Sequence, residues 1–189
     1  MHQHSLLRSV VAAALCLACP LAHPVQAETD AKAAAQIPVF DKGTMEVPAA
    51  FKQVAPKSRI IQHEFEVKAE SGEGTARLTM MAASGGIEAN IQRWKGQFGG
   101  DAKKVGETKK FQSGPFDCYV IDVTGSYAER MGGGPFFGGK TVQRENYAML
   151  GAILATEDGR TFFVKLIGPA DAVKPNEEAF VEMIKSVDD

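Results

Sequence analysis

Apolar and polar residues alternate in the first clearly patterned part of the chain, which is typical of a half-buried β-strand. From Arg59 onward every second residue belongs to one face, and these residues are Ile61, His63, Phe65 and Val67. After a glycine-containing turn at residues 70–74, the same alternation returns between Thr75 and Ala83. The two segments therefore predict a β-hairpin.

The spacing of apolar residues then changes to the three or four positions that are typical of a helix. One apolar stripe follows Ser84-Gly85-Gly86 and consists of Ile87, Ile91, Trp94 and Phe98. A second stripe follows Pro175, and it consists of Ala179, Phe180, Met183, Ile184 and Val187. Proline is favoured in the first turn of a helix. These patterns predict two long helices, one in the middle of the chain and one at its C-terminal end.

Four further strands are predicted between the helices, at residues 109–112, 116–125, 147–156 and 160–167. Asp158-Gly159 separates the last two and is a strong hairpin signal. The order β-β-α-β-β-β-β-α lacks the alternation of a parallel sheet. It predicts an α+β fold, a mostly antiparallel sheet packed with two long helices. We expect its core to include Ile61, Phe65, Leu78, Met80, Trp94, Ile121, Leu154, Phe163, Phe180 and Ile184.

The N-terminal segment has the organisation of a secretory signal peptide. Arg8 is the only formal charge before Glu28, and an apolar run ends shortly before Val25-Gln26-Ala27. That run is too short to span a membrane as a helix. We predict a signal peptide at residues 1–27, a mobile leader at 28–37 and a single globular domain at 38–189. Cleavage after Ala27 would yield an exported protein, periplasmic or extracellular, with no integral membrane segment; a lipid-anchored Cys19 is the alternative.

Cleavage would leave Cys118 and His63 as the single cysteine and the single histidine. No intramolecular disulfide could then form. A small hydrolase or thiol enzyme would need this pair as nucleophile and base. The alternation places His63 on an apolar face and Cys118 on a less apolar one, so we expect them on opposite sides of the sheet. No ligand spacing indicates a metal site, and we predict no cofactor.

A glycine-rich segment from Gly134 to Thr141 matches the phosphate-binding pattern G-x-x-x-x-G-K-[ST]. In a true P-loop a buried strand precedes the first glycine and a helix begins at the lysine. The residues before Gly134, Ala-Glu-Arg-Met-Gly-Gly at 128–133, do not have the pattern of a buried strand, so a hairpin loop is favoured over a nucleotide site.

The same loop is a candidate contact surface for a protein partner. Phe136 and Phe137 place two large apolar side chains at its centre, and Lys140 and Arg144 would add a basic rim. Exposed apolar patches mark interaction sites, although both rings could instead fold back onto the sheet. The net charge of −2 on 189 residues gives no field that would attract nucleic acid.

The C-terminal pattern resembles a known fold family. A strand that ends in Gly168-Pro169, a spacer, and a closing helix ending in Ser186-Val187 are similar to the Mog1/PsbP-like α/β/α sandwich, as is the opening Val-Pro-Ala-Ala-Phe at 47–51. The domain also resembles exported bacterial proteins of unknown function, notably at 87–98 and 144–147. The resemblance covers residues 38–187 and implies a non-enzymatic binding or assembly domain, without assigning any site residue.

Overall fold

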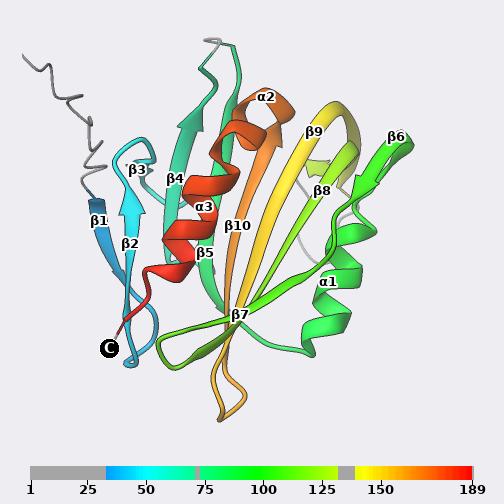
Figure 1. The fold of residues 1–189 in the computed structure, drawn as a ribbon. Coiled ribbons are helices and arrows are strands. Elements are labelled where there is room, and N and C mark those ends of the chain that lie inside the picture. Colours follow the sequence, from blue (N-terminus) through cyan, green and yellow to red (C-terminus); the bar gives the residue numbers. More distant parts are fainter. Residues whose placement is uncertain (1–32, 71–72, 132–138, 189) are drawn as a thin grey trace, which may run out of the picture. The chain divides into compact units, whose positions relative to one another are not determined.

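The computed structural model describes residues 33–70, 73–131 and 139–188 (Figure 1). Within these ranges the chain forms ten strands: β1 (Ala33–Pro38), β2 (Thr44–Pro48), β3 (Lys52–Val54), β4 (His63–Lys68), β5 (Thr75–Ala83), β6 (Phe98–Val105), β7 (Lys109–Ser113), β8 (Phe116–Met131), β9 (Lys140–Ala155) and β10 (Thr161–Pro169). The helical elements there are α1 (Ile87–Lys95), α2 (Ala170–Val173), the 3₁₀ turn η1 (Lys174–Asn176) and α3 (Glu177–Lys185).

Eight of these strands form one sheet with the order β3-β4-β5-β10-β9-β8-β6, and β7 also pairs with β8. β1 and β2 form a separate two-stranded sheet. Every pairing between the described strands is antiparallel. The Asp158-Gly159 turn joins β9 to β10, as the sequence predicts. The expectation of a mostly antiparallel sheet is therefore confirmed.

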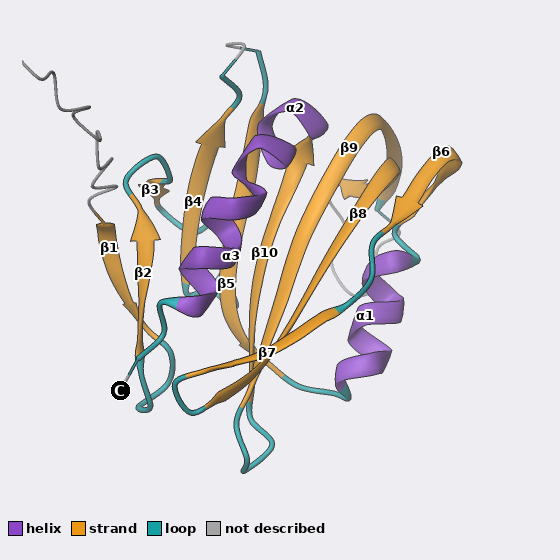
Figure 2. Ribbon diagram, viewed as in Figure 1, coloured by secondary structure: helices purple, strands orange, loops and turns teal. Residues whose placement is uncertain are grey.

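Side chains alternate between the two faces of the main sheet, and both faces are buried. One face carries a large core that includes Phe65 and Phe180 and is covered by α2, α3 and the β1–β2 hairpin. The opposite face carries a smaller core that includes Trp94 and Phe163 and lies under α1. Figure 2 shows α3 crossing one face of the sheet and α1 lying near β6.

The prediction of two long helices is wrong. α1 has nine residues and ends at Lys95, because Gly96 caps it and Phe98 already belongs to β6. Its apolar stripe is therefore completed by a strand residue. The long helical segment is at the other end of the chain, where α2, η1 and α3 follow one another over residues 170–185. Pro175 lies inside this segment, in η1, rather than at its beginning.

Part of the expected leader and one residue of the expected core are placed differently in the structure. Ala33–Pro38, within the segment expected to be a mobile leader, forms β1 and pairs with β2. Ile61 precedes β4 and is only half-buried, whereas the other nine residues of the expected core are buried. The predicted order also lacked β1, β2, β3 and β6. These strands are short or rich in glycine and alanine, so alternation alone does not reveal them.

Candidate functional site

An open cleft lies on the face of the sheet that α1 only partly covers. A nine-residue helix is about 13 Å long, whereas neighbouring strands lie about 4.8 Å apart, so an eight-stranded sheet extends well beyond α1. α1 packs on residues of β8, β9 and β10, and the face above β5 is left open. The cleft there has a volume of about 710 Å³, within the usual range of ligand sites. We call it the α1 cleft; its lining includes Arg77, Thr79, Arg93, Trp94, Phe163 and Lys165.

Trp94 forms the wall of the α1 cleft on the helix side. Its ring meets the ring of Phe163 edge to face, with the two centres 5.1 Å apart. On β9 the ring lies directly against the backbone of Gly151, where an added Cβ would come within 2.7 Å of it. Gly151 thus permits the close approach that holds this wall in place.

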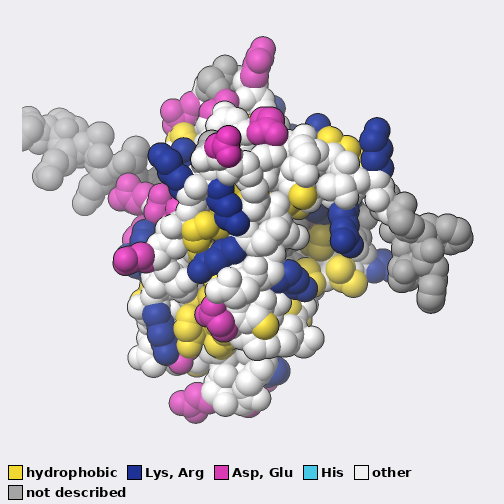
Figure 3. Space-filling model, turned by 90° about the vertical axis from the view of Figure 1, so that its right-hand side faces the viewer, with side chains coloured by type: hydrophobic (Ala, Val, Ile, Leu, Met, Phe, Trp, Pro, Cys, Tyr) yellow, Lys and Arg dark blue, Asp and Glu magenta, His cyan; other side chains and the backbone are white. Residues whose placement is uncertain are grey.

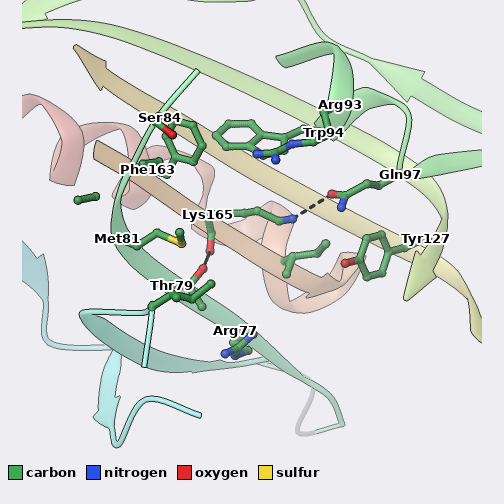
Figure 4. Close-up of a pocket in the computed structure, with 14 residues that line it drawn as sticks. Arg77, Thr79, Met81, Ser84, Arg93, Trp94, Gln97, Tyr127, Phe163 and Lys165 are labelled. Carbon is green, nitrogen blue, oxygen red and sulfur yellow. Dashed lines mark hydrogen bonds between the residues drawn. The ribbon is translucent and has the colours of Figure 1, made fainter. Parts of the chain in front are cut away.

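Lys165 lies on the floor of the α1 cleft, in the middle of β10 (Figure 4). Its amine donates a hydrogen bond to the Gln97 Oε1 atom at 3.0 Å, and the Tyr127 ring centre is 5.9 Å away. Figure 4 shows Trp94 and Phe163 on one side of this side chain and Arg77 on the other. Burial, with the nearby charges of Arg93 and Arg77, lowers the pKa of Lys165 to about 8.

The α1 cleft carries an excess of positive charge. Arg77 donates two hydrogen bonds to the buried carboxylate of Glu64 on β4, at 2.6 and 2.9 Å, and these bonds are the main reason that the pKa of Glu64 is lowered. Arg93 binds the neutral side chain of Asn90 at 2.7 Å, and the partner of Lys165 is also neutral. None of the described residues that line the cleft is acidic.

Figure 3, which views the molecule from the side that carries α1 and β6 in Figure 1, shows Lys and Arg side chains interspersed with hydrophobic ones on this surface. Ile60, which is 68% exposed, adds an apolar group to the edge of the α1 cleft. The cleft therefore offers cationic and apolar contacts together.

The structure does not bring Cys118 and His63 together. The two residues lie on the same face of the sheet, so the expectation that they lie on opposite sides is wrong. That expectation assumed that only one face of the sheet is apolar, whereas both faces are buried. Three strands lie between β4 and β8 in the sheet, so the two side chains are much too far apart to form a hydrogen bond. Burial raises the pKa of the Cys118 thiol to about 12 and lowers the pKa of His63. This pair cannot act as nucleophile and base.

The candidate contact loop can be placed only in part, because Phe136 and Phe137 lie outside the described residues. Lys140 is exposed at the start of β9. Arg144 is paired with Glu129 of β8, with 2.8 Å between Nε and Oε2, so its guanidinium already has an acidic partner. Lys140 and Thr141 begin a strand, not the helix that a P-loop requires.

Metal-binding clusters, membrane-spanning helices and disulfides are absent from the described residues. They contain no group of three or more His, Cys, Asp or Glu side chains placed to hold a metal ion. No helix among them is long and apolar enough to cross a membrane. Cys118 is free, and the described part of the chain has no disulfide.

Lys165 and Arg77 are not among the site residues that the sequence predicts. The available signal was a single cation within an otherwise apolar strand: Lys165 stands between Val164 and Leu166, and Arg77 between Ala76 and Leu78. A charge at such a position is rarely buried without a partner or a function. No protein-family model matches the chain, and no curated protein matches it either.

Proposed function

We propose that the protein is a non-enzymatic binding domain whose α1 cleft holds a small organic anion with an apolar or aromatic part. The observation that carries this proposal is the ammonium group of Lys165, half-buried beside Arg93 and Arg77 and hydrogen-bonded to an uncharged amide. A desolvated cation gains most from an anion brought close to it, because Coulomb interactions strengthen as the local dielectric constant falls.

The walls of the α1 cleft favour the apolar part of such a ligand. Met81, Tyr127 and Ile167 are only partly buried and supply apolar and aromatic surface, and Ile60 supplies an exposed aliphatic side chain at the edge. Aromatic pairs contribute about 0.5–1.5 kcal/mol beyond the area they bury. A carboxylate near Lys165 and a ring against Tyr127 and Ile167 would use both kinds of contact.

The test uses 4-methylbenzoate as a probe and the neutral 4-methylbenzamide as its matched control. Trp94 is the only tryptophan of the chain, so its fluorescence reports directly on the cleft. We expect the acid to change this fluorescence in a saturable way. The amide should bind at least about tenfold more weakly, because a hydrogen bond to a charged group contributes about 1.5–3 kcal/mol and tenfold corresponds to about 1.4 kcal/mol.

Single substitutions test whether 4-methylbenzoate binds in the α1 cleft. Arg93→Gln and Lys165→Met should each weaken binding of 4-methylbenzoate, whereas Lys109→Met, which removes an exposed lysine of β7, should leave it unchanged. Equal binding of acid and amide, or equal affinity in all three variants, would remove the α1 cleft as an anion site.

Export belongs to the same proposal. The pattern of residues 1–27 supports cleavage after Ala27, and the Mog1/PsbP-like resemblance supports a binding role rather than an enzymatic one. Intact-mass measurement of the exported protein should give a chain that begins at Glu28. A mass that retains an acylated Cys19 would replace this with a lipid-anchored protein.

A further inference from the structure

We propose that the α1 cleft captures small oxo acids covalently, with the ε-amine of Lys165 forming a reversible imine while Arg93 holds the carboxylate. This inference rests on the proposed function, because it assigns a carbonyl group to the anion bound there. It adds a chemical role for Lys165 that charge alone does not require.

The surroundings of Lys165 are those of an imine-forming lysine. Such lysines are activated by desolvation or by a neighbouring cation. Lys165 has both: β10 places it on the floor of the α1 cleft, Arg77 approaches from β5 and Arg93 from α1. The other polar side chains that line the cleft are the uncharged Gln97, Tyr127, Thr79 and Ser84. The carboxylate of Glu64 is engaged by Arg77.

These contacts increase the fraction of neutral amine. With a pKa of about 8, about a tenth of Lys165 is unprotonated at pH 7, compared with a few parts in ten thousand for an ordinary exposed lysine. The hydrogen bond to Gln97 directs the amine across the cleft, where a bound carbonyl would lie. Burial also raises the pKa of Tyr127, so its phenol stays uncharged.

The reaction balances without any oxidant or reductant. The lone pair of the neutral amine forms the N–C bond, and the carbonyl π electrons move to oxygen, which takes up a proton as nitrogen loses one. The resulting carbinolamine loses its hydroxyl together with the second amine hydrogen as water, which leaves a C=N bond. Hydrolysis reverses each step and returns the free amine.

The experiment applies 4-carboxybenzaldehyde to the full chain with cyanoborohydride, which reduces the imine to a stable amine. Peptide mapping by mass spectrometry then locates and times each adduct. We expect Lys165 to be modified at least about tenfold faster than Lys109 at pH 7.5, because desolvation keeps more of the Lys165 amine neutral and Arg93 holds the probe's carboxylate beside it. Benzaldehyde, which lacks the carboxylate, should lose most of this preference, and so should the Arg93→Gln variant.

Two results would overturn the inference: modification of Lys165 no faster than that of Lys109, or equal preference with benzaldehyde. Binding of 4-methylbenzoate, which has no carbonyl to attack, tests the proposed function separately, so it can persist when covalent capture fails. Lys165→Arg keeps the charge and should retain 4-methylbenzoate binding while forming no adduct at this position. If Lys165→Arg does not fold, comparing the two aldehydes on the unmodified chain and on Arg93→Gln still tests covalent capture.

Discussion

At the scale of single residues, Lys165 has surroundings that differ from those of a surface lysine. Its amine is half-buried next to Arg93 and Arg77, and its pKa falls to about 8. The folded protein therefore holds this proton less tightly than the unfolded chain does, in which the pKa of lysine is about 10.4. Keeping Lys165 protonated in the folded protein at neutral pH therefore lowers the free energy of unfolding.

A pH dependence of stability follows from this difference. Between pH 8 and 9.5 the unfolded chain keeps the Lys165 proton while the folded chain releases it, so the free energy of unfolding rises with pH. We expect a rise of about 1–2 kcal/mol from this group across that range. Urea unfolding at several pH values measures it, and Lys165→Met should remove this part of the rise. An unchanged pH profile in the variant would contradict the lowered pKa.

Gly151 of β9 leaves no room for a side chain beside the ring of Trp94. An alanine Cβ there would lie 2.7–2.8 Å from two ring carbons of Trp94, so the ring must move. We expect Gly151→Ala to lower the free energy of unfolding by about 1–3 kcal/mol and to change the Trp94 fluorescence. Gly99→Ala in β6 is the matched control, since nothing lies within 4 Å of its added Cβ, and it should have little effect. Equal stability of the two variants would mean that the ring adapts freely.

At the scale of elements, α1 is held to the sheet by one apolar stripe. Ile91 and Trp94 are its main buried apolar residues, and they pack against β8, β9 and β10. Trp94→Ala would remove the largest of these contacts and leave a cavity, at a cost of about 3–5 kcal/mol in urea unfolding. Glu88→Ala, on the exposed side of α1, is the comparison and should cost far less. A loss below about 1 kcal/mol for Trp94→Ala would mean that α1 contributes little to stability.

The sequence was informative about elements where the pattern is strong and local. Alternation placed β5, and Asp158-Gly159 placed the turn between β9 and β10, because both depend on neighbouring residues. The length of α1 was overestimated, since Phe98 continues its spacing from within a strand. When a helix and the strand after it pack into the same core, their apolar residues can follow one helical spacing in the sequence. The tertiary structure then shows where the helix ends.

The α1 cleft could not be predicted in the same way. Lys165 and Arg77 lie on different strands, β10 and β5, which become neighbours only through the sheet order. Which face of the sheet each residue occupies, and how much of that face a short α1 leaves open, depends on register and on packing across it. For the same reason Cys118 and His63 were placed on opposite faces, although both faces turn out to be buried.

At the scale of the whole described domain, the two cores share the strands between them. β8, β9 and β10 alternate their side chains, so that each strand contributes to both faces. Val120 and Ile121 are successive residues of β8 and belong to different cores. Loss of either core would leave the same strands without support on one side, and we therefore expect one cooperative unfolding transition.

Trp94 and Cys118 report on the two faces separately, which makes this expectation testable. Trp94 lies in the core under α1, and Cys118 is fully buried in the core on the other side. In a urea series, Trp94 fluorescence and the reaction of Cys118 with a thiol reagent, located by peptide mapping, should show the same midpoint. Trp94→Ala should then shift the exposure of Cys118 to lower urea, although the two residues lie on opposite faces. If the fluorescence changes while Cys118 stays protected, the α1 face unfolds independently and the two cores are separate cooperative units.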